Sequence, residues 1–300
     1  ILIGLVGSEM CIRDRYMKII GIIILLIGCV ILWQHFELKK FRITSYEYRT
    51  DKVTQSVTFA VVADLHAHVY GRDNDILIQK IKEQKPDMIL VPGDMIVSRY
   101  PETYETAYQA LAKLTEIAPV YFSNGNHESR VSKVPVMQTE AFLAYENRVR
   151  KSGVHILNNA STELTLHGEK FCISGLEIPL ECYGKGSYEP LPEHFIQEAL
   201  GEAKKDAVQI LLAHNPMFAK EYADWGADIT VCGHTHGGLV RIPGIGSVIS
   251  PQFELFPKYD AGEFEFDGKK VYVSKGLGTH TFHIRVFDRA EVLMIRINKM

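Results

Sequence analysis

The chain contains an apolar stretch, Thr58-Phe59-Ala60-Val61-Val62-Ala63-Asp64-Leu65-His66, that ends in a carboxylate and an imidazole two positions apart. A continuous apolar run of this length predicts a strand buried on both faces, as at the centre of an α/β sheet. Asp64 and His66 then lie at the carboxyl end of that strand. Because side chains alternate along an extended chain, both are expected to project to the same side, where an oxygen and a nitrogen can bind one cation.

The same pattern recurs further along the chain. Four more apolar runs end in side chains that can bind metals, and predicted helices separate several of these runs. The runs lead into Asp94, into Asn126 and His127, into His214, and into His234 and His236. In open α/β sheets, ligands bind at the carboxyl ends of the strands. The sequence therefore predicts an α/β domain in which these groups converge on one site.

Each of these residues has a structural explanation when it is considered alone. A single histidine at a strand end is usually a hydrogen-bonded core or surface group, and the segment Asn124-Gly125-Asn126 is also typical of a turn. Residues 233–238 are rich in glycine and are compatible with a simple bend. The hypothesis of a metal site rests on the whole set, because all of its members follow apolar strands in one chain.

Composition limits the function classes. The chain has 300 residues, 46% of them apolar, and a formal net charge of −3, so it can build a substantial core but has no long basic block for nucleic acid. Small anionic substrates remain compatible with this composition because a bound metal ion can neutralise their charge. The five cysteines include no C-x-x-C pair, which favours buried thiols over a disulfide framework or a zinc-thiolate site.

The amino terminus differs in character from the rest of the chain. Residues 1–16 have the character of translated adapter sequence, and Met17-Lys18 resembles a natural start. Residues 17–36 are apolar and carry Trp33 near their end, which predicts a transmembrane anchor or a signal segment. We expect the folded domain to occupy residues 37–300, and we see no further domain boundary inside it.

Two alternatives for this segment stay open. The run could be a cleaved signal peptide, and Leu26-Ile27-Gly28-Cys29 also fits a lipoprotein-processing pattern, although the residues after Cys29 remain apolar. Lysines and arginines lie on both sides of the run, so the positive-inside rule does not decide which side of the membrane carries the domain. We predict a single-pass cell-membrane protein with the side undetermined.

Two other segments carry local predictions. Residues 42–48 alternate between polar and apolar side chains, which predicts an edge strand. Residues 154–178 contain short alternating runs broken at Gly168 and Gly175, which predicts antiparallel pairing.

Five motifs in this order resemble those of the calcineurin-like metallophosphoesterases over about residues 57–285. They are Asp64-Leu65-His66, Gly93-Asp94, Gly125-Asn126-His127-Glu128, His214 and Gly233-His234-Thr235-His236. The extended Gly-His-Thr-His-Gly-Gly segment and the apolar amino terminus resemble the membrane-associated bacterial branch, which includes proteins similar to UDP-2,3-diacylglucosamine pyrophosphatases. The resemblance implies a four-layer α-β-β-α sandwich of two mixed sheets, preceded by the membrane helix.

The resemblance also implies two divalent metal ions. One ion would be bound by Asp64, His66 and His236, the other by Asn126, His214 and His234, and Asp94 would bridge the two. This mixture of carboxylate, imidazole and amide ligands suits Mn, Fe or Zn. A metal-activated water would attack the phosphorus, and His127 would protonate the leaving group or stabilise its charge.

One position departs from the family pattern. Many members read Gly-Asp-x-x-Asp, and here Val97 occupies the place of the second aspartate, which can orient the catalytic histidine. His127 must then be oriented by another group, such as Glu128. Other residues that could face a substrate are His68, His280, His283, Arg99, Arg130 and Lys275.

The function that the resemblance implies is hydrolysis of a phosphoester or pyrophosphate bond in a phosphorylated small molecule or a lipid-linked or envelope substrate. One alternative is a nuclease or cyclic-nucleotide phosphodiesterase on the same site, although we expect no nucleic-acid partner. Another alternative is a non-catalytic scaffold with a vestigial metal site. The sequence does not indicate the substrate, the metals or the oligomeric state.

Overall fold

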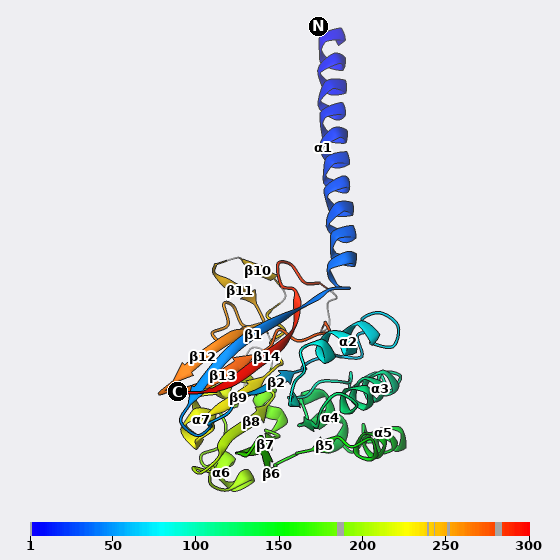
Figure 1. Cartoon of the computed structure of the whole chain (residues 1–300). Coiled ribbons are helices and arrows are strands. Elements are labelled where there is room, and N and C mark those ends of the chain that lie inside the picture. Colours follow the sequence, from blue (N-terminus) through cyan, green and yellow to red (C-terminus); the bar gives the residue numbers. More distant parts are fainter. Residues whose placement is uncertain (1, 185–188, 239, 243, 251–252, 280–283) are drawn as a thin grey trace. The chain divides into compact units, whose positions relative to one another are not determined.

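The computed structural model describes residues 2–184, 189–238, 240–242, 244–250, 253–279 and 284–300 (Figure 1). The chain forms two compact units, Ile1–Lys40 and Phe41–Met300. The first unit contains the helix α1 (Leu2–Glu37). Its segment Arg15–Glu37 has 23 residues and a mean hydropathy of 2.5, which makes it long and apolar enough to cross a membrane. This helix is a candidate membrane anchor, and a signal sequence would have the same properties.

The second unit contains two mixed six-stranded sheets. The strands of the first sheet, in spatial order, are β1 (Phe41–Thr50), β14 (Ala290–Lys299), β2 (Val57–Val61), β3 (Met88–Val91), β4 (Val120–Phe122) and β5 (His155–Ile156). Those of the second are β12 (Gly262–Phe266), β13 (Lys269–Val273), β9 (Ile229–Cys232), β8 (Val208–Ala213), β7 (Glu169–Leu176) and β6 (Ala160–Leu166). A separate hairpin joins β10 (Val240–Ile242) to β11 (Gly246–Ile249).

Helices flank the two sheets. The described helices that follow strands of the first sheet are α2 (Asp75–Glu83), α3 (Thr103–Thr115), α4 (Asn126–Lys133) and α5 (Glu140–Lys151). Those that follow strands of the second are η1 (Leu180–Tyr183), α6 (Phe195–Leu200), η2 (Pro216–Phe218) and α7 (Ala219–Trp225). Figure 1 shows α2 to α5 gathered on one side of the unit and α6 and α7 near β8 and β9.

Strand alternation produces the layers. On β2, Phe59 and Val61 belong to the apolar cluster between the sheets, which also contains Ile210 of β8. Ala60 lies between them in sequence and belongs instead to the cluster with the helices of the first sheet, including Leu111 of α3. A third cluster packs the second sheet against α6 and α7. Full burial of a side chain such as Phe59 stabilises the fold by roughly 1.5–3 kcal/mol.

The predicted α/β class and the four-layer sandwich are confirmed. The predicted edge strand is also present, because β1 lies at the end of its sheet and pairs with β14. The prediction of antiparallel pairing holds for β6 and β7 but is wrong for β5, which pairs in parallel with β4 in the first sheet. The two residues of β5 are too few for their alternation to indicate a partner.

The parallel pairing of neighbouring strands positions the site. Strands β2, β3 and β4 run parallel to one another, and so do β8 and β9. The carboxyl ends of parallel strands meet at the same edge of a sheet. Because the two sheets pack face to face, the residues that follow these five strands reach one common region.

Candidate metal centre

The structure brings the predicted ligands together in overlapping groups. The donor atoms of Asp64, His66 and His236 lie within 4.8 Å of one another, and so do those of Asp94, His214 and His234. A third group of the same kind joins His66 and Asp94 to His127. The seven aspartate and histidine side chains of these groups and Asn126 are all buried. Side chains that are more than 100 positions apart in the sequence therefore gather in one buried cluster.

Individual distances show how the two groups meet. Nε2 of His214 lies 3.0 Å from Oδ2 of Asp94 and 3.7 Å from Oδ1 of Asp64. Nε2 of His66 lies 3.8 Å from Oδ2 of Asp94 and 3.1 Å from Nε2 of His236. The carboxylate of Asp94 thus faces one histidine from each predicted metal set.

Left-handed backbone turns, rather than strand alternation, aim the ligands. Strand β2 ends at Val61, and Asp64 and His66 have φ angles of 51° and 45°. Asp94, His234 and His236 have φ angles of 55°, 73° and 52°. The prediction that residues 64 and 66 project together from an extended strand is therefore wrong in its reason. Such conformations cost about 1–3 kcal/mol each and persist only where the surrounding structure imposes them.

The motif glycines leave room for the carboxylates. A Cβ atom on Gly125 would lie 2.2 Å from Oδ1 of Asp94, and one on Gly233 would lie 2.4 Å from Oδ2 of Asp64. These separations are far below van der Waals contact. The glycines of the Gly-Asn-His and Gly-His-x-His motifs are therefore needed because the backbone passes directly against the two aspartates.

Backbone carbonyls orient two of the histidines. Nδ1 of His66 donates to the carbonyl of Ile96 at 3.1 Å, and Nδ1 of His214 donates to the carbonyl of Pro92 at 2.8 Å. A carbonyl can only accept, so each ring carries a proton on Nδ1, and Nε2 is the atom that faces the site. This second hydrogen bond is typical of histidines that bind metals.

The electrostatics of the pocket favour a cation. Burial raises the pKa of Asp64 to about 7. Burial also opposes the ionisation of Asp94, but His214, His127 and His66 hold its pKa well below the usual range. Burial lowers the pKa of His214, yet the two carboxylates raise it to about 9. Buried carboxylates need a positive partner, which is either a protonated histidine or a metal ion.

Asn126 provides a direct test of whether the residues fit a metal. It is the first residue of α4, and its side-chain oxygen Oδ1 is buried with no hydrogen-bond partner among the residues that the structure describes. A buried amide oxygen without a partner costs about 1–3 kcal/mol. A cation ligated by this oxygen would remove that cost, so the residue type and its position fit the predicted role.

Glu128 holds the loop that carries Asp94. Its carboxylate accepts hydrogen bonds from the backbone N–H groups of Asp94, Met95 and Ile96 at 2.8 to 3.2 Å and from that of Gly125 at 3.1 Å. Burial and the nearby Asp94 raise the pKa of Glu128 to about 8, whereas the N–H donors lower it. Neither this role nor helix α4 was predicted from the sequence. The available signal was a glutamate three residues after Gly125, the residue that caps the helix.

His127 is oriented by a backbone group. Its ring Nδ1 accepts a hydrogen bond from the backbone N–H of Ser98 at 2.9 Å. The backbone N–H of His127 donates to Oδ1 of Asp94 at 2.8 Å. The prediction that Glu128 orients this ring is therefore wrong. The Glu128 carboxylate instead accepts hydrogen bonds from the backbone of the loop that carries Asp94. Since Nδ1 accepts, the neutral ring carries its proton on Nε2. Burial lowers the pKa of His127.

The other suggested contacts are distributed around the site. His68 is half-buried, with its ring centre 4.6 Å from that of Tyr70. Lys275 is buried, and its Nζ lies 3.2 Å from Oδ1 of Asp288. Arg99 is exposed and Arg130 is half-buried, and both lie close enough to lower the pKa of His127. His280 and His283 lie outside the described residues.

Comparison with known proteins agrees with this geometry. Residues 57–238 match the family model described as calcineurin-like phosphoesterase. The chain belongs to the calcineurin-like phosphoesterase family. Its relatives include the phosphodiesterase YaeI of Escherichia coli, 27% identical over 215 residues, a match that covers 72% of each chain. They also include the uncharacterized metallophosphoesterase YkuE of Bacillus subtilis, 26% identical over 242 residues that cover 78% of this chain and 77% of YkuE.

Among solved structures, the phosphopantetheinyl hydrolase PptH of Mycobacterium tuberculosis superposes with a TM-score of 0.44 and 16% identity. That match covers 74% of this chain and 89% of PptH. Membership of the calcineurin-like phosphoesterase family makes the chain a metal-dependent phosphoester hydrolase with residues that could hold metal ions. The predicted family and enzyme class are confirmed.

We predict that Glu128→Ala disrupts the centre. Four backbone N–H groups would lose their acceptor, and each buried donor left unsatisfied costs about 1–3 kcal/mol. We expect the free energy of unfolding to fall by at least about 3 kcal/mol and the bound metal to decrease. Urea denaturation and metal analysis of the purified protein measure the two effects.

The matched control is Glu83→Ala, which removes a surface carboxylate at the end of α2. It should leave both properties near those of the parent. A Glu128→Ala protein with parental stability and parental metal content would contradict the role given to Glu128.

Proposed function

We propose that this chain is a binuclear metal-dependent phosphoesterase. One ion is bound by Asp64, His66 and His236, and the other by Asn126, His214 and His234. Asp94 lies between the two sets and bridges the ions. The observation that carries the proposal is the position of the Asp94 carboxylate, whose Oδ2 lies 3.0 Å from Nε2 of His214 and 3.8 Å from Nε2 of His66. One carboxylate within reach of both sets is what a shared ligand requires.

The ligand types limit the choice of ion. Four imidazoles, two carboxylates and one amide form a mixed nitrogen and oxygen set, which suits Mn, Fe or Zn better than Mg or Ca. When bound, the two ions would lower the pKa of a coordinated water and neutralise the charge on the phosphate oxygens. The protein's part is to hold the ligands in place before substrate arrives, through the hydrogen bonds of Glu128, Ile96 and Pro92.

His127 acts on the leaving group in this proposal. Its ring packs edge-on against His66, with the centroids 4.8 Å apart, so it borders the predicted metal site. The N–H of Ser98 occupies Nδ1, which leaves the proton on Nε2. From there Nε2–H can donate a hydrogen bond to the oxygen on which charge develops as the ester bond breaks, and so stabilise the leaving group. Val97, which replaces the family's second aspartate, leaves this positioning to the backbone of the next residue.

The substrate class is proposed from the amino terminus. The segment Arg15–Glu37 could hold the enzyme at a membrane, where phosphoesters with lipid parts are concentrated. We infer a phosphoester or pyrophosphate with a lipid-linked or envelope component, such as a UDP-2,3-diacylglucosamine-like compound. In this proposal the protein is a single-pass membrane enzyme.

One prediction tests the role of Asp94 as the ligand shared by both ions. Asp94→Asn keeps the size of the side chain but removes the negative charge that two cations share. We expect metal content to fall below one ion per chain and turnover to fall by about 1,000-fold or more, since a bridging charge contributes several kcal/mol to the transition state. Elemental analysis and hydrolysis of bis-p-nitrophenyl phosphate measure these changes.

Asp224→Asn, on the exposed face of α7, is the matched control and should behave as the parent. If Asp94→Asn retained two ions and near-parental hydrolysis, the assignment of the bridge would be refuted.

The second prediction tests the role of His127. His127→Ala should retain both ions, because the ring is not among the proposed ligands, but should lose rate by about 100- to 10,000-fold for esters with poor leaving groups. Esters of acidic phenols need little help and should lose much less. The measurement is a plot of log kcat against leaving-group pKa for parent and variant. An equal loss across all leaving groups would count against stabilisation of the leaving group by His127.

A further inference from the structure

A group of exposed apolar side chains lies on one part of the second unit. The hairpin β10–β11 is flanked on both sides: Val240 of β10 bridges to Val286, and Ile249 of β11 bridges to Leu255. The hydrogen bond from the N–H of Phe256 to the carbonyl of Val248 extends the second flank. These four adjacent segments form a surface that we call the hairpin platform. Its large exposed apolar residues are Ile242, Ile245, Phe253, Leu255, Phe256, Ile284 and Phe287.

This concentration is unusual within the unit. Thirteen large apolar side chains are exposed in the described part of residues 41–300, and seven of them belong to the hairpin platform. Individual exposed apolar residues need no explanation, but a contiguous group marks a surface that meets a partner or a membrane. Ile245, at the turn of the hairpin, is 69% exposed, and Phe287 is 66% exposed.

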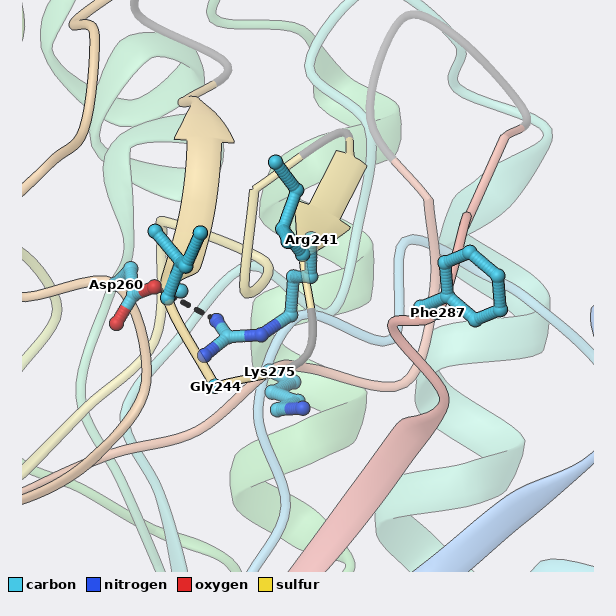
Figure 2. A pocket seen from close by; sticks show the side chains of 8 residues that line it. Arg241, Gly244, Asp260, Lys275 and Phe287 are labelled. Atoms are coloured by element: carbon cyan, nitrogen blue, oxygen red, sulfur yellow. Dashed lines mark hydrogen bonds and ion pairs between the residues drawn. The ribbon is translucent and has the colours of Figure 1, made fainter.

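A cationic cavity opens beside this surface. It has a volume of about 440 Å³, and Figure 2 shows Arg241, Lys275 and Asp260 around it together with Phe287 of the platform. The described residues that line it are Arg241, Ile242, Gly244, Ile245, Gly246, Asp260, Lys275 and Phe287. Polar groups from the interior and apolar groups from the surface therefore meet in one opening.

The charges around the cavity do not cancel. Nη1 of Arg241 lies 2.8 Å from Oδ2 of Asp260, Nζ of Lys275 lies 3.2 Å from Oδ1 of Asp288, and Nη1 of Arg285 lies 3.2 Å from Oδ2 of Asp288. Of these charged side chains, Arg241, Lys275 and Asp260 line the cavity, and two cations against one carboxylate leave one positive charge in excess.

The outer part of the platform adds further positive charge. Lys258 and Arg289 are exposed close in sequence to Phe256 and Phe287. Glu254, on the same surface, is half-buried, so the two cationic side chains outnumber the one carboxylate. The charge of the platform therefore complements an anion.

The cavity is joined to the metal centre by short contacts. Nη1 of Arg241 donates to the carbonyl of Gly237 at 3.0 Å, one residue after the predicted ligand His236. The hydroxyl of Thr235 donates to the carbonyl of Asp260 at 2.8 Å. A group held in the cavity therefore lies against the loop that supplies two of the proposed ligands.

We propose that the hairpin platform docks on an anionic phospholipid bilayer and that the adjoining cavity receives the phosphate of a lipid headgroup. The inference rests on the membrane anchoring and the phosphoesterase activity proposed above. Apolar side chains enter the interfacial layer, and Arg241 and Lys275 provide the charge that a phosphodiester headgroup needs. Only residues 38–40 separate α1 from β1, so a bilayer that holds α1 stays within reach of the domain, at a high effective concentration of lipid.

Fluorescence quenching in vesicles tests this proposal. The full chain carrying Trp33→Phe is reconstituted into vesicles of phosphatidylcholine and phosphatidylglycerol with bromine on the acyl chains. Ile245→Trp then places an indole at the hairpin turn, and Val136→Trp, at a position that is 89% exposed outside the platform, is the matched control. Trp225 remains in both proteins as a common background.

We expect at least about twofold stronger quenching for Ile245→Trp than for Val136→Trp, because bromine quenches only indoles that enter the acyl region. Quenching should be stronger when the bromine is on phosphatidylglycerol than when it is on phosphatidylcholine. A chain that floats with the vesicles but shows equal quenching at both positions overturns the docking surface. Equal quenching by the two lipids overturns the headgroup site.

The same experiments distinguish failure of the docking surface from failure of the membrane anchor or of the phosphoesterase activity. A chain that does not float with the vesicles contradicts the anchor and the docking together. Hydrolysis of soluble bis-p-nitrophenyl phosphate by the unmodified chain reports the phosphoesterase activity independently, since quenching does not depend on turnover.

Discussion

The carboxylate of Glu128 accepts hydrogen bonds from four backbone N–H groups that belong to two different loops. Three of these groups lie in the loop after β3, which presents Asp94, and the fourth is that of Gly125, immediately before α4. The N-terminus of α4 presents Asn126 and His127. One buried side chain therefore fixes the separation between the proposed bridge, a proposed ligand and the proposed hydrogen-bond donor to the leaving group. The left-handed turn at Asp94 is maintained because its N–H groups have this acceptor.

Two folding constraints make this arrangement possible. Parallel pairing of β2 with β3 and β4, and of β8 with β9, delivers the following loops to one edge of the molecule. The packed apolar layer between the sheets, which includes Phe59 and Ile210, fixes the two edges against each other. The cost of burying two aspartates at this edge is offset by nearby histidines, and it would be offset further by metal ions. A cation that binds here would therefore be stabilised by the buried negative charge of the two aspartates.

The sequence predicted those features of the fold and the site that depend on the local order of apolar and polar residues. Apolar runs such as residues 58–63 identify central strands, and the polar residues after them identify the site edge. The reason given for the approach of Asp64 and His66 was wrong, because their turns depend on contacts with residues near Asp94 and Gly93 rather than on strand alternation. Glu128 was assigned to the wrong partner because the backbone N–H groups that donate to its carboxylate are brought together only when β3 and α4 are adjacent. The hairpin platform was also missed, since its four segments are joined by long-range bridges.

We expect Asp94 to join two cation sites within one buried cluster of side chains. This expectation is tested most directly by anomalous diffraction from crystals of the chain loaded with manganese or zinc. We expect two anomalous peaks about 3.5–4 Å apart, both within coordination distance of the Asp94 carboxylate. One peak should lie among Asp64, His66 and His236 and the other among Asn126, His214 and His234. A single peak, or two peaks that do not share Asp94, would contradict the account.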